Sequence, residues 1–333
     1  MPDSLTPTVA EPLNIEPPVS ALDAPITPTH VFFTRNNGTV PEMEPGWTLS
    51  VTGLVERELT LTPEALRARF PTVEVVSVME CAGNNRSAIT PAVDGLAWGA
   101  GAVGCARWTG VRLADVLEAA GVSPRAVYVG FRSPDHVIGK PGVEALSRGL
   151  PIAKALSPET LIAFGMNGAP LTALHGAPLR IVAPGFPGSA WQKWLREILV
   201  LDREHDGAKM TGLDYRMPRR PLRPDEDPAG TEFDVITDMP VKSLITAPPE
   251  GFSTPGPVAV RGFAWSGHVP VAKVEVSADG GASWHHARLE AGASQWAWRR
   301  FTAELAVPPG PVTLMARATD MAGKTQPMDP PWN

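Results

Sequence analysis

Proline is the feature that most restricts how this chain can fold. The 333 residues include 37 prolines, which occur along the whole length and are frequent near both ends. Proline fixes its own φ angle and donates no backbone hydrogen bond, so helix interiors rarely contain it. We therefore expect short strands and ordered loops rather than long helices. A chain of this length is also too long to fold around one compact hydrophobic core, so we expect two domains.

Local patterns over residues 30–202 predict both strands and helices. Thr62 has the residue type of a helix N-cap, with Pro63 and Glu64 after it, and Gly121 is typical of the end of a helix over 113–121. Residues 73–79 are apolar and mostly β-branched, which favours a central strand. Further strands are expected at 47–55, 126–131, 160–164 and 179–184. The fold class predicted from these patterns is α+β, with a mixed α/β first domain.

The composition changes after residue 202. Residues 203–234 are charged and proline-rich, which is typical of a linker or a crossing segment. From 235 to 333, short segments alternate apolar and polar residues at a period of two, and residues 279–281 (Asp-Gly-Gly) favour a hairpin turn. This predicts an immunoglobulin-like β-sandwich without a disulfide. Residues 1–29 are expected to form a tail that wraps around the fold or is partly disordered.

Charge and hydropathy exclude several classes of partner. The formal net charge of −6 argues against binding to nucleic acid or to an anionic membrane, because both need a basic surface. No segment approaches the roughly 20 apolar residues of a membrane span. A secretory signal has a basic segment followed by an apolar one. The N-terminus of this chain is acidic and proline-rich instead, so it does not resemble such a signal. We therefore expect a cytoplasmic protein, or a periplasmic one if a signal had been removed.

Cys81 is the first candidate for a metal ligand, because of the residues around it. It follows the expected strand at 73–79 and precedes Gly83, with Arg86 five positions later. A cysteine at such a place is most often a small core residue. A tight turn and a nearby cation would instead favour a thiolate, the form that binds metals. The spacing to Cys105 fits neither a CxxC motif nor a disulfide framework, and we expect Cys105 to be a core residue.

Longer motifs around Cys81 resemble the sulfite oxidase family. The first half contains ECAGNNR, GLAW, ARWTGVRLADVLEAAG and FGMNGAPLTALHGAPLRIVAPGFPGSAWQKWL, and the second contains GFAWSG, VEVSADGGASW and ARATDMAGKTQP. They occur in the family's order and extend over residues 30–333. The resemblance implies a molybdopterin-binding domain over 30–202, a dimerisation domain over 235–333 and a molybdenum–molybdopterin cofactor (Moco).

The resemblance also assigns roles to individual residues. Cys81 matches the one protein ligand of the molybdenum. The catalytic positions of the family match Arg35, Arg86, Trp98 and Tyr215. Its cofactor contacts match Phe33, Thr34, Arg35, Asn36, Asn37, Asp135, His175, Arg180, Trp191, Gln192 and Lys193. In this assignment arginines bind an oxyanion through forked donors, and cations with backbone donors bind the cofactor phosphate. Taken singly, each residue would more often be a surface charge or a core side chain.

Three departures from the family pattern bear on the substrate. Asn37 replaces the usual histidine, and Asn85 stands where an arginine is common. The sequence ends at Pro331-Trp332-Asn333, just before the place where vertebrate enzymes have another substrate arginine. These differences predict a less cationic pocket with lower affinity for sulfite, or a different substrate.

The leading hypothesis is two-electron oxygen-atom transfer, with sulfite oxidised to sulfate. The sequence shows neither a CxxCH haem motif nor a GxGxxG nucleotide motif, so we expect no haem and no NAD. Electrons would pass to an external acceptor such as a cytochrome, and the second domain would form a homodimer. The alternative within the same fold is reductive removal of oxygen from a sulfoxide, an N-oxide or nitrate. A non-catalytic binding protein is a third hypothesis, against which the presence of Cys81, Arg180 and Lys193 argues.

Overall fold

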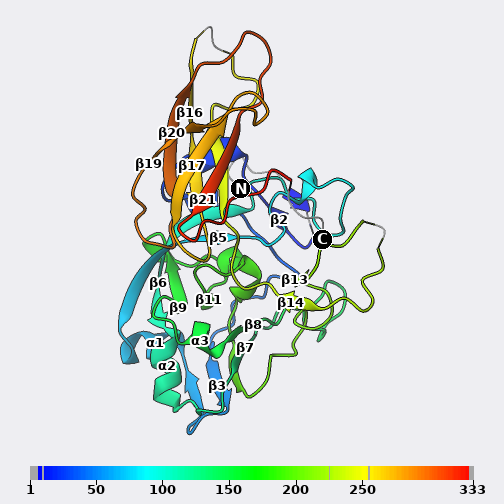
Figure 1. The fold of residues 1–333 in the computed structure, drawn as a ribbon. Coiled ribbons are helices and arrows are strands. Elements are labelled where there is room, and N and C mark those ends of the chain that lie inside the picture. Colours follow the sequence, from blue (N-terminus) through cyan, green and yellow to red (C-terminus); the bar gives the residue numbers. More distant parts are fainter. Residues whose placement is uncertain (1–6, 10, 225, 254–255, 330–333) are drawn as a thin grey trace.

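Antiparallel strands make up most of the regular structure in this computed structural model (Figure 1). It describes residues 7–9, 11–224, 226–253 and 256–329, so the predicted departure at 331–333 lies outside the described residues. Among these residues the longest helix is α2, Leu113–Ala120. The shortness of the helices agrees with the high proline content. Two layers of strands form the lower domain in Figure 1, and a β-sandwich stands above it.

The first domain contains two five-stranded sheets. One has the order β10-β9-β6-β5, with β11 also pairing with β9, and the other has the order β4-β3-β12-β7-β8. Only the β12–β3 pair in these two sheets is parallel. The strands are β3 Leu49–Gly53, β4 Leu59–Leu61, β5 Thr72–Glu80, β6 Val103–Arg112, β7 Tyr128–Arg132, β8 Gly149–Pro151, β9 Leu161–Met166, β10 Ala169–Pro170, β11 Arg180–Val182 and β12 Glu197–Leu201.

The helices of this domain begin and end where local chemistry predicts. In α1, Pro63–Arg69, the Thr62 hydroxyl accepts a hydrogen bond from the backbone N–H of Ala65 at 3.1 Å. Gly121 ends α2 in the left-handed region with φ 72°, which glycine adopts at no steric cost. Both predictions are confirmed. The remaining helical segments are α3 Ile152–Ala155 and the 3-10 turns η1 Val19–Leu22, η2 Arg86–Ala88, η3 Ala173–His175 and η4 Gly188–Ala190.

Strand β5 is not central, so that prediction is wrong. It is the last strand of its sheet, and the second domain covers its open edge. The backbone N–H of Val78 donates to the carbonyl of Trp296 at 2.9 Å, and the Ser294 hydroxyl donates to the carbonyl of Val76 at 2.6 Å. An edge that is paired in this way needs no charged residues to prevent aggregation. Its apolar sequence therefore reflects the interface between the two domains.

The second domain is the predicted β-sandwich. One sheet has the order β15-β16-β20-β19, the other has the order β18-β17-β21, and their apolar side chains pack together around Val260, Val274 and Phe301. The Asp279–Gly281 stretch forms the expected turn, with Gly280 and Gly281 at φ 69° and 87°. The strands are β15 Lys242–Ala247, β16 Val258–Trp265, β17 Val271–Ser277, β18 His285–His286, β19 Arg288–Leu289, β20 Arg299–Leu305 and β21 Met315–Asp320.

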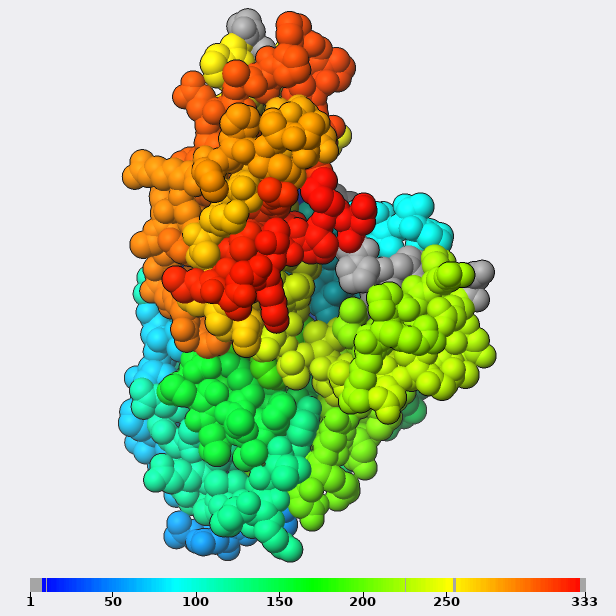
Figure 2. Space-filling model, in the orientation of Figure 1, coloured from blue at the N-terminus to red at the C-terminus, as the bar shows by residue number. Residues whose placement is uncertain are grey.

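Two segments outside these sheets complete the fold. The crossing segment contains a small hairpin of β13, Arg216–Pro218, and β14, Phe233–Val235, and lies as a lobe beside the first domain in Figure 2. The N-terminal segment carries β1, Pro7–Val9, and β2, Asn14–Ile15, which pair with each other. It contacts both domains, because Ile15 bridges to Thr34 and Asp23 accepts hydrogen bonds from Arg261 and Arg300.

A buried carboxylate joins the end of β5 to the second domain. Glu80 is 1% exposed, and its oxygens accept hydrogen bonds from Lys242 Nζ at 2.7 Å, Trp265 Nε1 at 2.8 Å and Asn84 Nδ2 at 3.0 Å. Because Glu80 immediately precedes Cys81, these bonds also fix the start of the Cys81 turn.

Replacing Lys242 with methionine is expected to lower the free energy of unfolding by about 2–4 kcal/mol, because it leaves the Glu80 carboxylate buried without its cation. Urea unfolding measures the change. Lys273→Met is the matched control. Its Glu275 partner keeps Arg317 at 3.1 Å, and the Lys273 side chain is 47% exposed. This control should cost no more than about 1 kcal/mol. Equal losses in the two variants would contradict the prediction.

Candidate active site

A cavity in the first domain brings together most of the residues that the sequence singled out. It has about 660 Å³ of empty space, including its open mouth. Cys81 reaches it from the turn after β5. The other walls come from the segment 33–37, the loop between β7 and β8, the loops around η3, η4 and β11, and the crossing segment just before β13. The predicted residues among its walls are Phe33, Arg35, Asn36, Asn37, Cys81, Asp135, His175, Arg180, Trp191, Gln192, Lys193 and Tyr215.

Three predicted residues, Thr34, Arg86 and Trp98, are not among the cavity walls. Thr34 is occupied in the backbone bridge to the N-terminal segment. The Arg86 guanidinium lies against the turn that follows Cys81 and donates to the carbonyl of Leu96 at 3.1 Å. Trp98 is fully buried and meets Phe33 edge-on, with ring centroids 6.5 Å apart. Trp98 thus supports a wall of the cavity from outside it, and catalytic roles for Arg86 and Trp98 stay predictions.

Asn85 also lies outside the cavity. It is exposed, has a left-handed backbone with φ 68°, and donates from its N–H to the carbonyl of Gly99 at 2.7 Å. Asparagine tolerates this conformation better than most residues. The exposed side chain gives no support to the prediction that Asn85 makes the pocket less cationic. Its residue type instead suits the turn. Asn37, the other departure, does line the cavity and accepts a hydrogen bond from Arg35 Nη2 at 2.9 Å.

Six wall residues were missed by the sequence analysis. Trp194 has a left-handed backbone with φ 51°, as does Tyr215 with φ 53°. Such strained positions in non-glycine residues concentrate at functional sites. Ser189 and Trp194 lie close to the predicted stretch 191–193 in the sequence. This closeness is the only feature of the sequence that could have indicated them. The six are Met79, Leu146, Leu174, Gly188, Ser189 and Trp194.

Burial dominates the environment of the Cys81 thiol. The residue is 8% exposed, and burial raises the pKa of its thiol, while the charges of Arg35 and Arg86 act in the opposite direction. The two arginines alone therefore do not produce the predicted thiolate. A bound metal cation would, since metal coordination deprotonates a thiol. Cys105 is fully buried, as predicted, and burial raises the pKa of its thiol to about 12.

Cations outnumber carboxylates around the cavity. Its charged walls are Arg35, Arg180 and Lys193, with Asp135 as the carboxylate, and none of the four has an ion-pair partner within 4.0 Å among the described residues. Burial lowers the pKa of Arg180 to about 9 and that of Lys193 well below its ordinary value, and it raises the pKa of Asp135. Buried charge without a counter-charge is costly, so the cavity favours an anionic ligand.

Two buried polar atoms in the walls have no hydrogen-bond partner among the described residues. They are His175 Nε2 and Ser189 Oγ. The other ring nitrogen of His175 contacts Thr172 Oγ1 at 2.8 Å, and burial lowers the imidazole pKa to about 3, so the ring is neutral. Leaving such groups unpaired costs about 1–3 kcal/mol each. A polar ligand in the cavity would remove this cost, which fits a pterin with a phosphate group.

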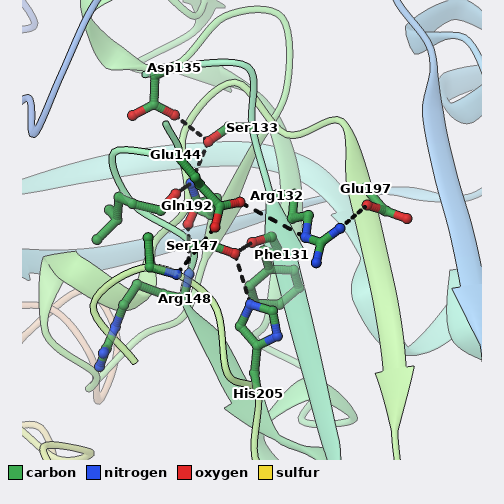
Figure 3. A network of polar contacts seen from close by, with 12 residues as sticks. Phe131, Arg132, Ser133, Asp135, Glu144, Ser147, Arg148, Gln192, Glu197 and His205 are labelled. Carbon is green, nitrogen blue, oxygen red and sulfur yellow. Dashed lines mark hydrogen bonds and ion pairs between the residues drawn. The ribbon is translucent and has the colours of Figure 1, made fainter. Parts of the chain in front are cut away.

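A polar network behind the cavity fixes Gln192 and Asp135 (Figure 3). Gln192 Nε2 donates to the carbonyl of Leu146 at 3.0 Å and to the Ser133 hydroxyl, which in turn donates to Asp135. Gln192 Oε1 accepts from the backbone N–H of Arg148 at 3.1 Å. The network therefore connects two residues of the cavity wall, Gln192 and Asp135, to Arg148, which does not line the cavity.

The N-terminal segment also orders a wall of the cavity. Asn14 is 1% exposed, and its Oδ1 accepts from Arg35 Nη1 at 3.2 Å and from the backbone N–H of Asn36 at 2.8 Å. Asn36 Oδ1 in turn accepts from Lys193 Nζ. One amide from a segment expected to be a tail thus positions two predicted site residues. Nothing in its local sequence indicates this role.

Replacing Asn14 with leucine is expected to raise the KM for the anionic substrate, because Arg35 loses an acceptor that orients it. The free energy of unfolding should fall by about 1–3 kcal/mol, since the Asn36 N–H is left unpaired. Asn14→Asp keeps the acceptor but adds a negative charge beside Arg35. It should also raise KM, and it too should lose stability, because the Asn14 amide donates to the Pro12 carbonyl at 2.6 Å and a carboxylate cannot. Steady-state kinetics and urea unfolding measure both effects, and an unchanged KM in both variants would contradict the positioning role.

Comparison with known proteins agrees with this geometry. Residues 37–209 match the family model of the oxidoreductase molybdopterin binding domain, and residues 233–333 match that of the Mo-co oxidoreductase dimerisation domain. A sulfite oxidase from Arabidopsis thaliana is 32% identical over 99% of this chain and 90% of its own length. The chain belongs to the sulfite oxidase family. The resemblance found in the sequence is thereby confirmed, as is the predicted fold class.

Other members of the sulfite oxidase family and its neighbours show how far the similarity extends. Human mitochondrial sulfite oxidase is 36% identical over 97% of this chain, which spans 62% of the human protein. A barley NAD(P)H nitrate reductase is 33% identical over 98% of this chain and 40% of its own length. The sulfane dehydrogenase SoxCD from Paracoccus pantotrophus has a similar structure, with a TM-score of 0.81 and 29% identity over 95% of this chain and 78% of that chain.

None of the helices in the described part of the chain has the length and hydropathy needed to cross a membrane.

Proposed function

We propose that this protein is a molybdopterin-dependent oxidoreductase that oxidises sulfite to sulfate and passes the electrons to a separate acceptor such as a cytochrome. The observation that carries the proposal is the cavity, which combines one thiol at a strand end, an excess of cations and two unpaired polar atoms; of the cations, Arg180 is buried and the other two are half-buried. This combination suits a phosphate-bearing cofactor with a metal near Cys81 and a small oxyanion beside it. Membership of the sulfite oxidase family supports the same assignment.

The cofactor would be held by residues on two sides of the cavity. Cys81 would supply the one protein sulfur to the metal. The pterin and its phosphate would be bound by His175, Ser189, Arg180 and Lys193, whose side chains form no ion pair within the described part of the chain. When bound, the cofactor supplies two-electron oxygen-atom transfer. The protein itself contributes binding, orientation and electrostatics.

The substrate anion would lie near Arg35 and Tyr215. Arg35 offers a forked donor, and its orientation is fixed by Asn14 and Asn37. Burial raises the pKa of the Tyr215 hydroxyl, so it stays protonated and can donate a hydrogen bond to an oxyanion. Donors fixed in advance lower the barrier without reorganising during the reaction. We therefore infer that catalysis depends on positioned charge rather than on a general acid or base.

The alternative is the reductive direction, with oxygen removed from nitrate, a sulfoxide or an N-oxide. One observation favours it: a nitrate reductase is 33% identical over 98% of this chain. The match to a dimerisation domain at 233–333 supports a homodimer for either direction. The cytoplasmic location stays a prediction from sequence.

Two assays on one preparation test the proposal. Turnover with sulfite and ferricyanide is compared with turnover of nitrate or a sulfoxide and a reduced dye, and the molybdenum content of the same sample is measured. We expect about one molybdenum per chain and turnover with sulfite. A preparation made with pterin available that contains no molybdenum would refute the cofactor. A loaded protein that reduces nitrate but does not oxidise sulfite would favour the alternative.

A further inference from the structure

Arg148 is a buried guanidinium that the proposed function has not used. The residue precedes β8 and is 1% exposed. Its backbone is fixed on both sides, because its N–H donates to Gln192 Oε1 at 3.1 Å and its carbonyl accepts from Phe131 at 2.8 Å. The side chain leaves the network of Figure 3 on the side away from His205. The backbone from which this guanidinium extends is therefore held by the same contacts that order a wall of the cavity.

The charge of Arg148 has little compensation. Nη1 donates to the backbone carbonyl of Lys209, and Nε has no hydrogen-bond partner among the described residues. No carboxylate of the described part of the chain lies within 4.0 Å of this guanidinium. Glu204 acts on it only at longer range and is itself paired with Arg216. An uncompensated buried cation destabilises a fold, and such groups persist where a function needs them.

The Arg148 guanidinium lies against a residue of the cavity wall. Its central carbon is 5.0 Å from the ring centroid of Tyr215, within the range of a cation–π contact. Tyr215 lines the cavity together with Arg35 and Cys81. Its backbone is in the left-handed region with φ 53°, which a tyrosine rarely adopts, so the surrounding contacts must hold the ring in place.

We propose that Arg148 is a positioning residue for the substrate anion, which orients the Tyr215 ring and adds a positive charge one side chain behind the cavity wall. This inference rests on the proposed function, because it assigns the anion to the side of the cavity that Tyr215 lines. The charge lies in the protein interior, so dissolved ions screen it far less than a surface charge. The effect on anion binding should therefore persist at high salt.

The test uses the molybdenum-loaded enzyme and three substitutions at this position. Arg148→Met removes the charge and keeps a long unbranched side chain, Arg148→Gln removes the charge and keeps a polar group, and Arg148→Lys keeps the charge. The neutral variants should raise the KM for sulfite roughly 10-fold with little change in kcat, and the lysine variant should restore most of the loss. Because the methionine and glutamine variants remove an uncompensated charge, their melting temperatures should be no lower than that of the wild type.

Sulfate binding gives a second readout that does not need turnover. Isothermal titration with sulfate should show the same roughly 10-fold weakening in the neutral variants, at both low and high ionic strength. Arg67→Met is the matched control. Arg67 also lies over an aromatic ring, that of Phe164 at 4.4 Å, but it is exposed on α1 and is not a wall of the cavity. It should change neither KM nor sulfate affinity.

The outcomes separate this inference from the proposed function. Neutral variants that keep the wild-type KM and sulfate affinity overturn the role of Arg148 while leaving sulfite oxidation in place. Neutral variants that melt lower but bind sulfate normally also overturn it, because they show a merely structural residue. A loaded wild-type enzyme that does not oxidise sulfite refutes the proposed function, and the sulfate titration still decides whether Arg148 acts on an oxyanion.

Discussion

Serine in place of Cys81 is expected to abolish turnover while the fold is retained. The hydroxyl is a harder and much weaker metal ligand than a thiolate, and Cys81 is the cavity's only cysteine among the described residues. The substitution changes the size of the side chain little. It should lower the free energy of unfolding by no more than about 1–3 kcal/mol, the cost of a buried unpaired hydroxyl. Turnover, molybdenum content and urea unfolding measure the three effects.

Cys105→Ser is the matched control for this experiment. Cys105 is also buried, at 0% exposure against 8% for Cys81, but it lies in the core cluster between the two domains, outside the cavity. It should lose a similar amount of stability and keep its turnover. Wild-type turnover in the Cys81 variant would refute the assignment of Cys81 as the metal ligand.

Methionine in place of Lys193 should cause the second large effect, a loss of cofactor. Lys193 Nζ lines the cavity and donates to the carbonyl of Leu174 at 3.0 Å, and no carboxylate of the described residues pairs with it. A charge-assisted bond to a phosphate would disappear in this variant, so we expect the affinity for the cofactor to fall roughly 10- to 100-fold. The pterin and molybdenum content after gel filtration measures it. Lys140→Met, an exposed lysine, should retain the wild-type content.

The same lysine predicts a pH dependence for the cofactor-free protein. Burial lowers the folded-state pKa of Lys193 well below its ordinary value, whereas the unfolded chain protonates this lysine normally. Between these two pKa values the unfolded state binds more protons, so the free energy of unfolding should rise with pH up to about 10.5. Lys193→Met should flatten this rise in urea-unfolding experiments from neutral to alkaline pH. An identical slope in both proteins would contradict the prediction that Lys193 lacks a compensating charge in the folded protein.

Local sequence was sufficient to predict elements whose stabilising contacts are close in the chain. The Thr62 N-cap bonds a residue three positions away, and Gly121 ends its helix through its own backbone conformation. The strands of the second domain follow from period-two alternation and a glycine turn. Such elements are determined by interactions among a few neighbouring residues, so the local sequence is enough to predict them.

Strand β5 shows where a local pattern becomes ambiguous. A run of apolar residues is the same for a strand between two others and for an edge that another domain covers. The contact that decides between them, from Ser294 to Val76, joins residues 218 positions apart. Hydropathy reports that a strand is buried, but not by which part of the chain.

The sequence alone determined the family and the two kinds of domain, because these are carried by motifs with a fixed order. It also predicted the residues that would contact the cofactor, and most of them line the cavity. Only the tertiary structure decided which cations lack a counter-charge. Packing of segments far apart in the chain makes Asn14 a hydrogen-bond acceptor for Arg35. It also places the buried Arg148 guanidinium against the Tyr215 ring. The physical reason is that the energy of a charge depends on its surroundings in space, which no stretch of sequence contains.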